Sequence, residues 1–100
     1  MKVVFTDAAE ADIETTGDYI ALSNPSRAVS FIREIRVKCL SLHDASHAFP
    51  LLPNQQASGI RRRVHGNYLI FYRVGPEAVE ILHVLDGARD LEPILFPRDD

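Results

Sequence analysis

The chain has 100 residues, of which 46% are hydrophobic and 25% are charged, and its formal net charge is −3. This length and composition predict one globular domain over residues 1–100 with a single core, and the acidic balance argues against nonspecific binding of a polyanion. No long apolar run predicts a membrane span, no secretory pattern opens the chain, and the single cysteine, Cys39, cannot form an internal disulfide, so we expect a cytoplasmic protein.

The first predicted elements are a strand and a helix. Residues 2–6 (KVVFT) are rich in β-branched and aromatic side chains, which favours a strand. Asp7 and Glu10 have the spacing of a capping box with Asp7 as the N-cap, and they predict a helix that continues to about Leu22. Gly17 inside this helix indicates close packing against another element.

A second helix is predicted to begin at Asn24 and Pro25, with asparagine as the cap and proline at the first helical position. Apolar residues then recur at helical spacing and form a seam about five turns long. The seam consists of Ala28, Ile32, Ile35, Cys39 and Leu42. Because only a couple of residues separate the two helices, we expect an antiparallel helical hairpin.

The segment from His43 to Gly59 is rich in proline, serine and glycine and predicts a loop. It contains His43 and His47 at a spacing that could place two imidazoles on one face of a helix. The pair straddles a helix end and a proline-bearing loop, with no third ligand nearby in the sequence. We therefore predict no metal site, and no cofactor.

Three strands are predicted after the loop, over residues 60–65, 68–74 and 78–85. Gly66 and Asn67 form a two-residue hairpin turn, which pairs His65 with Tyr68. The order of elements predicts an α+β fold, in which an N-terminal strand and an antiparallel helical hairpin are followed by three strands of a mostly antiparallel sheet.

Both faces of this sheet carry apolar and basic side chains. One face of the hairpin presents Ile60, Arg62, Val64, Leu69, Phe71 and Arg73, and the other presents Arg61, Arg63, His65, Tyr68, Ile70 and Tyr72. In the last strand, strict alternation places Val79, Ile81, His83 and Leu85 on one face of the sheet and Leu82 and Val84 on the other. Because the helices can cover only one face, we expect the uncovered face to be a binding surface. A bulge in the arginine-rich strand would shift this register.

Charge is unevenly distributed along the chain. The segment from Asp7 to Asp18 holds five carboxylates and no lysine or arginine, whereas the segment from Arg61 to Arg73 holds four arginines and no carboxylate. Two interpretations remain open: two solvated faces of opposite sign, or a basic segment that meets an acidic partner.

Four segments, in this order and with these gaps, resemble the ParE/RelE superfamily of toxins from bacterial toxin-antitoxin operons, and ParE more closely than RelE. They are AEADIETTGDYI at 9–20, NPSRAVSFIREI at 24–35, GNYLIFYRV at 66–74 and EILHVLDGARDLEPIL at 80–95. The resemblance implies a RelE/ParE-like fold and a toxin component of a type II toxin-antitoxin system. It also implies a hetero-oligomer with a cognate antitoxin, a DNA-binding dimer whose C-terminal segment wraps the toxin, so that operator DNA is reached only through the antitoxin.

The target that the resemblance implies depends on the branch. ParE members act on DNA gyrase, whereas RelE members cleave mRNA on the ribosome with cationic side chains and a C-terminal tyrosine. Carried over by position, Arg89 matches the arginine after the last strand and Arg62 could stand for a basic residue of the second strand. The third-strand arginine position falls on Leu69, and the tyrosine position falls on about Leu95.

Two groups of the nuclease set are therefore missing, and we predict a non-enzymatic gyrase inhibitor with no catalytic residues. The alternatives are a RelE-like mRNA endonuclease and a non-toxic binding module of the same fold. For the endonuclease, the candidate proton carriers are His65, Tyr68, Tyr72 and His83.

Two sets of binding residues are predicted. For the antitoxin we expect the helical hairpin and the uncovered face of the sheet, with Ile13, Tyr19, Ile20, Phe31, Arg61, Arg63, Tyr68 and Tyr72. For the toxic target we expect the C-terminal tail, with Arg89, Asp90, Leu95, Phe96 and Arg98.

The Arg89–Asp90 pair has two interpretations. In the first, the guanidinium of Arg89 satisfies carbonyls or a carboxylate at the end of the sheet, while Leu91, Ile94 and Leu95 hold the tail against the core. In the second, Arg89 contacts the target directly. We favour the first.

Overall fold

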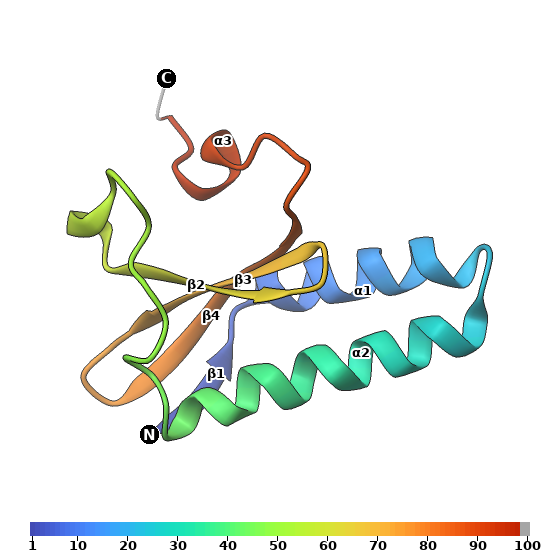
Figure 1. Ribbon diagram of the computed structural model, residues 1–100, viewed down its shortest axis with the longest axis horizontal. Coiled ribbons are helices and arrows are strands. Elements are labelled where there is room, and N and C mark those ends of the chain that lie inside the picture. Colours follow the sequence, from blue (N-terminus) through green and yellow to red (C-terminus); the bar gives the residue numbers. More distant parts are fainter. Residues whose placement is uncertain (99–100) are drawn as a thin grey trace.

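The computed structural model describes residues 1–98, and Figure 1 shows the two long helices on one side of a central sheet and the C-terminal segment, with its short helix, on the other. The main elements are β1 (Lys2–Phe5), α1 (Asp7–Ala21), α2 (Pro25–Leu40), β2 (Ile60–His65), β3 (Tyr68–Val74), β4 (Ala78–Asp86) and α3 (Glu92–Leu95). Short 3-10 helices, η1 (Ser41–His43) and η2 (Gln56–Ser58), interrupt the long loop. Within residues 1–98, no helix is long and apolar enough to cross a membrane.

The sheet has four strands in the order β1-β4-β3-β2. β1 pairs with β4 in parallel, and the other two pairings are antiparallel. The predicted α+β fold, with its helical hairpin packed on a mostly antiparallel sheet, is confirmed.

Thr6, rather than Asp7, caps helix α1. The Thr6 hydroxyl accepts a hydrogen bond from the amide of Ala9 at 3.1 Å and donates to the carbonyl of Ile81 at 2.8 Å. A carboxylate could not make the second bond, because it has no proton to donate. The predicted capping box is wrong for its other member too, since Glu10 pairs with Arg36 on α2.

The helical hairpin is fixed by a cap and by close packing. Asn24 caps α2 as predicted, with its side chain accepting from the amide of Arg27 at 3.0 Å. Gly17 is buried, and a Cβ atom built on it would lie 2.7 Å from Cδ1 of Ile32. The prediction of close packing at Gly17 is therefore confirmed.

The β2–β3 hairpin has the predicted register. His65 lies opposite Tyr68, and the pairing continues to Ile60 opposite Arg73. Gly66 has a positive φ of 59°, as a two-residue turn requires. The bulge considered for the arginine-rich strand is not present there.

A bulge does occur between β3 and β4. Phe71 lies opposite His83, but the next residue, Tyr72, lies opposite Ile81. Leu82 is therefore an additional residue in β4. The strict alternation predicted for the last strand is wrong from this point onward.

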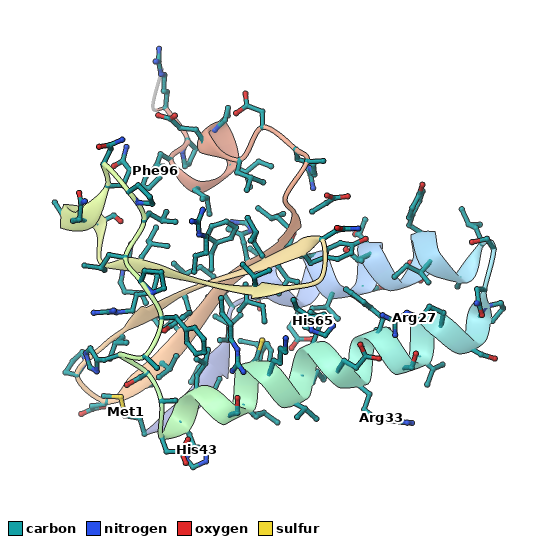
Figure 2. The ribbon with its side chains drawn as sticks, in the orientation of Figure 1. Met1, Arg27, Arg33, His43, His65 and Phe96 are labelled. Carbon is teal, nitrogen blue, oxygen red and sulfur yellow. The ribbon has the colours of Figure 1, made fainter. Side chains whose placement is uncertain are left out.

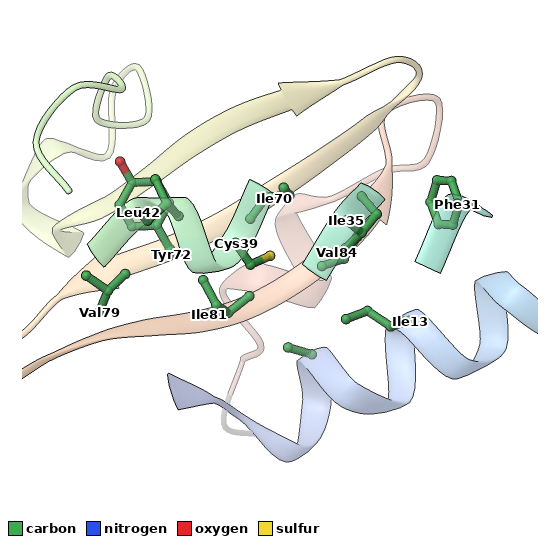
Figure 3. Packing of buried hydrophobic residues seen from close by; sticks show 11 residues of the cluster. Ile13, Phe31, Ile35, Cys39, Leu42, Ile70, Tyr72, Val79, Ile81 and Val84 are labelled. Carbon is green, nitrogen blue, oxygen red and sulfur yellow. The ribbon is translucent and has the colours of Figure 1, made fainter. Parts of the chain in front are cut away.

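Each face of the sheet has its own hydrophobic cluster. The cluster under the helices (Figure 3) consists of Ala9, Ile13, Phe31, Ile35, Cys39, Leu42, Ile70, Tyr72, Val79, Ile81 and Val84. The cluster on the opposite face consists of Leu52, Ile60, Phe71 and Leu85, against which Leu69, Leu82, Leu91, Ile94, Leu95 and Phe96 pack. Because of the bulge, Val84 is on the helix side with Ile81, whereas Leu85 is on the other side.

Candidate functional site

Two adjoining hollows form a groove between the helical hairpin and the end of the sheet. The larger, of about 480 Å³, is lined by Ala11, Asp12, Thr15, Thr16, Tyr19, Tyr68, Val84, Asp86 and Arg89. The second is lined by Ile20, Arg27, Phe31, His65, Gly66, Asn67 and Tyr68. Tyr68 belongs to both hollows, and we call the two together the α1–hairpin groove.

Two tyrosines that differ in exposure line this groove. The ring of Tyr68 packs on Phe31 with centroids 4.8 Å apart, and burial, followed by the nearby Asp86, raises the pKa of its hydroxyl. Tyr19 is 72% exposed on the face of α1 that borders the groove. One ring is therefore anchored and the other is available for contact, which suits a site that binds a protein segment.

Arg89 lies at the end of the larger hollow, just after β4. The Asp86 side chain accepts from the amide of Ala88 at 2.9 Å, and the Asp86 carbonyl accepts from the amide of Arg89 at 3.2 Å, so the backbone turns sharply here. The Arg89 side chain is exposed and makes no hydrogen bond or ion pair with any residue from 1 to 98. A guanidinium without a partner at the mouth of a hollow can bind a carboxylate or a carbonyl.

Within residues 1–98, no carbonyl or carboxylate binds the Arg89 guanidinium, so this part of the chain gives no support to the interpretation of Arg89 as a structural clamp. The tail is instead held by apolar contacts, because Leu91, Ile94, Leu95 and Phe96 pack against the cluster on the outer face of the sheet. The part of the prediction that placed apolar tail residues against the core is confirmed.

A polar network closes the other end of the groove. Nε2 of His65 lies 3.1 Å from Oε1 of Glu34, and Arg27 donates to the same carboxylate at 2.6 Å. The bond from Arg27 is the main cause that lowers the pKa of Glu34. In Figure 2, His65 and Arg27 lie between the β2–β3 hairpin and α2. The network ties the tip of the hairpin to the helices.

The predicted antitoxin residues divide into two groups. Tyr19, Ile20, Phe31 and Tyr68 line the α1–hairpin groove, although Phe31 is largely covered. The remaining four are Ile13, Arg61, Arg63 and Tyr72, and none of them lies on an uncovered face of the sheet. Arg61, Arg63 and Tyr72 lie on the face that the helices cover, and Ile13 packs against that face from α1.

Each of these four residues has a structural contact. Ile13 and Tyr72 are buried in the core, at 1% and 0% exposure. Arg61 donates to the carbonyl of Phe49 at 2.7 Å. Arg63 donates to the carbonyl of Lys38 at 3.0 Å and stacks on the Phe49 ring at 4.6 Å. Their placement on an accessible binding face is therefore corrected.

The predicted target residues are also divided. Arg89 belongs to the α1–hairpin groove, whereas Asp90, Phe96 and Arg98 share a hollow along the tail. Leu95 faces the outer side of the sheet together with Phe96. Arg89 therefore lines a different hollow from the rest of the set.

Most of the candidate proton carriers are hydrogen-bonded, each to a different residue. The buried Tyr72 hydroxyl donates to the carbonyl of Ser46 at 2.8 Å. His65 is bound to Glu34, and Nδ1 of His83 lies 2.8 Å from Oδ2 of Asp12. Within the described part of the chain, no group of three or more His, Cys, Asp or Glu side chains gathers at a potential metal site.

Several residues of the groove were missed in the sequence. Asp12, Thr15, Thr16 and Asp86 line it, but none was predicted as a binding residue. Asp12, Thr15 and Tyr19 follow one another at spacings of three and four, which places them on one face of α1. A helical projection of α1 would have shown that Asp12 and Thr15 lie on the same face as Tyr19.

The fold is shared with a solved toxin complex. A chain from the structure titled "Chromosomal ParDE TA system from P. aeruginosa" superimposes with a TM-score of 0.75, over 86% of this chain and 95% of that chain, at 19% sequence identity. The match shows that the two chains share a small α+β fold. The search of curated proteins gave no match.

The family follows from the sequence. Residues 3–91 match the family model described as "ParE toxin of type II toxin-antitoxin system, parDE". The chain therefore belongs to the ParE toxin family.

Proposed function

We propose that this ParE toxin acts without catalysis, by binding DNA gyrase in the cytoplasm, and that a cognate antitoxin neutralises it. One observation carries the non-enzymatic part of the proposal. The hollow beside Arg62, on the outer face of the sheet, is lined by Leu69 and Leu95, where an RNA-cutting relative would place cations and a tyrosine. The other carried-over arginine, Arg89, lines a different hollow.

The gyrase target rests on family membership and is tested with purified protein. We expect the toxin to inhibit supercoiling by gyrase in vitro, and its expression to cause filamentation and a DNA damage response with intact mRNA. Cleaved mRNA would instead support the endonuclease. Normal growth with unaffected gyrase would support a non-toxic binding module.

We propose that the α1–hairpin groove receives a segment of the antitoxin. The exposed Tyr19 ring, the anchored Tyr68 ring and the Arg89 guanidinium, which has no partner within residues 1–98, lie around one hollow. Aromatic and arginine side chains dominate the energetics of protein interfaces. Tyr19→Ala is expected to weaken antitoxin binding about tenfold or more, equivalent to about 1.4 kcal/mol.

Val29→Ala is the matched control for Tyr19→Ala. Val29 is also an exposed helical residue, at 58%, but it lies on α2 and does not line the groove. Both affinities are measured by titration calorimetry. Equal affinities of the two variants for the antitoxin would show that the groove is not part of the antitoxin interface.

We propose that the tail beyond the groove contacts the toxic target. Phe96 packs against the outer cluster, so its removal also disturbs the fold. Removal of 97–100 is therefore the cleaner test, and removal of 96–100 measures the added effect of Phe96. We expect both truncations to weaken gyrase inhibition, and we expect antitoxin binding to persist when 97–100 are removed. A loss of antitoxin binding would move the tail into the antitoxin interface.

A further inference from the structure

The outer edge of β2 is closed over half its length by the chain itself. Leu52 donates its amide to the carbonyl of Ile60 at 3.0 Å, and Arg62 donates its amide to the carbonyl of Pro50 at 3.0 Å. Leu51 forms an isolated antiparallel bridge with Arg61. β2 is the last strand of the sheet on this side, so no further strand of the described chain follows.

The second half of this edge is open. The hairpin turn makes His65 and Tyr68 the closing pair, so the backbone groups of Arg62 and Val64 point away from β3. Among residues 1–98, neither the carbonyl of Arg62 nor the amide of Val64 has a hydrogen-bond partner. Lys38 donates to the carbonyl of Val64 at 3.4 Å. Val64 itself is 56% exposed.

Two unpaired groups separated in this way can bind a further strand in either direction. In a parallel ladder, a single residue opposite Arg63 would donate to the Arg62 carbonyl and accept from the Val64 amide. In an antiparallel ladder, the two residues on either side of the one opposite Arg63 would make these bonds, as Pro50 and Leu52 do on either side of Leu51, which pairs with Arg61. The open edge therefore has room for a short strand.

An apolar hollow and a cation adjoin the open edge. The hollow is lined by Arg62 and Glu92 together with apolar residues, which include Leu52, Leu69, Phe71, Leu95 and Phe96. The Arg62 side chain makes no hydrogen bond or ion pair within residues 1–98, and no residue of β2 carries a carboxylate. Lys38 adds a second positive charge beside Val64. With Arg62 and Lys38 against Glu92, the balance of charge here is positive and complements an acidic segment with apolar neighbours.

We propose that an extended segment of the antitoxin adds to the open edge of β2 as a further strand. The segment would place a carboxylate near Arg62 and apolar side chains in the adjoining hollow. Main-chain hydrogen bonds would supply affinity and the hollow would supply specificity, as in other cases of strand addition. The inference rests on the proposed function, because it names a second contact of the same partner, on the opposite face of the toxin from the α1–hairpin groove.

Val64→Pro tests the main-chain bond. Proline removes the outward amide and is tolerated on an edge strand, because that amide has no partner within the sheet. Val64→Thr keeps the amide and the β-branched shape, and is the matched control. We expect Val64→Pro to weaken antitoxin binding at least tenfold and Val64→Thr to leave it within threefold. Equal affinity of the two variants would overturn the proposal.

Arg62→Gln and Arg62→Glu test the charge. We expect the affinity to decrease in the order wild type, Arg62→Gln, Arg62→Glu, and the salt dependence of binding to be weaker in both variants. An unchanged affinity of Arg62→Glu would overturn the predicted carboxylate. Because Arg62 makes no polar contact within residues 1–98, we expect the free variants to unfold at the same urea concentration as the wild type.

Hydrogen exchange tests the strand addition in the wild-type protein, so the result does not depend on whether a variant folds. We expect the Val64 amide to exchange rapidly in the free toxin and to be protected at least a hundredfold in the wild-type complex. An unprotected Val64 amide in a complex that still loses affinity through Tyr19→Ala would overturn the strand addition alone. A wild-type toxin that does not bind the antitoxin would instead overturn the proposed function. A toxin homodimer in which Val64 is protected would assign the edge to a second copy of the chain and overturn the inference.

Discussion

Asp12 on α1 binds the ring of His83 and the backbone of β4 through a single carboxylate oxygen. Its Oδ2 atom lies 2.8 Å from Nδ1 of His83 and accepts from the amide of Val84 at 3.0 Å. Because a carboxylate can only accept, Nδ1 of His83 carries the proton in this bond. The pairing of β1 with β4 ends at Ile81, so Asp12 satisfies a strand amide that β1 does not reach.

Asp12→Ala is expected to destabilise the protein by about 2 kcal/mol, because the Val84 amide would remain buried without a partner. Asp12→Asn keeps an acceptor and should lose less. Urea denaturation followed by circular dichroism measures both. Asp18→Ala, at an exposed position of the same helix, is the control and should stay within about 0.5 kcal/mol of the wild type. A similar loss in the two alanine variants would show that Asp12 has no special role.

The contact between Gly17 and Ile32 predicts a coupling between two substitutions. Gly17→Ala adds about 1 kcal/mol of helix propensity, but its new Cβ would meet Cδ1 of Ile32 at 2.7 Å. Ile32→Val removes that methyl group. We therefore expect Gly17→Ala to be neutral or destabilising in the wild type and to stabilise the Ile32→Val protein, with a coupling of about 1 kcal/mol in a double-mutant cycle. Additive effects would contradict a direct contact between these two positions.

The ion pair between Glu10 and Arg36 predicts a pH dependence of stability. The hydrogen bond from Arg36, reinforced by its charge, lowers the pKa of Glu10 below the ordinary 4.5. A carboxyl group with a lowered pKa in the folded state stabilises the protein above the unfolded pKa and loses this contribution as the pH falls through the folded pKa. Both side chains are more than a third exposed, so we expect less than about 1 kcal/mol.

The measurement compares the wild type with Glu10→Gln in urea at pH 7 and at pH 3. The difference in the free energy of unfolding should be present at pH 7 and should vanish at pH 3. Glu14→Gln changes an exposed carboxylate of the same helix and should show no such difference. A Glu10→Gln difference that persists at pH 3 would exclude ionisation as its cause.

Cys39 is expected to be unreactive in the folded protein. Its side chain is buried in the cluster under the helices, and burial raises the pKa of its thiol to about 12 from the ordinary 9.0. At pH 8 the fraction of thiolate should be roughly a thousandfold lower than in the unfolded chain. Reaction with a chromogenic disulfide should therefore follow unfolding by urea. Ser23→Cys supplies an exposed thiol for comparison, and equally rapid reaction of Cys39 would show that the core opens readily.

Arg89→Ala should leave the fold intact and impair function. The side chain is exposed and has no polar partner within residues 1–98, so the free energy of unfolding should change by no more than about 0.5 kcal/mol. Because Arg89 lines the α1–hairpin groove, we expect weaker antitoxin binding. Arg73→Ala, in which the lost guanidinium donates to the carbonyl of Ser58, is the control for removal of an exposed arginine. A large loss of stability in Arg89→Ala alone would restore the structural interpretation.

The architecture could be predicted from the sequence because local signals agree with the tertiary structure. The cap at Asn24, the turn at Gly66 and the seam that ends at Leu42 each specify a local geometry that the fold retains. The order of elements then leaves few arrangements for a helical hairpin on a sheet.

The site was predicted less well because burial depends on distant partners. Arg61 and Arg63 are exposed-type residues, but both are partly buried and their guanidinium groups bind main-chain carbonyls, of Phe49 in the loop and of Lys38 on α2. The cap at Thr6 depends on the carbonyl of Ile81, which is far away in the sequence. The bulge at Leu82 has no proline or glycine to mark it. None of these contacts leaves a periodic pattern in the sequence.

The extra residue in β4 has a consequence for comparisons between relatives. Leu82 packs against the outer cluster, while Ile81 before it and Val84 after it both belong to the cluster under the helices. A relative that lacks one residue here could keep both clusters and form a regular ladder. Alignments of this family should therefore allow a single-residue gap at this position, since an alignment without one would exchange the two faces of the strand from there to its end.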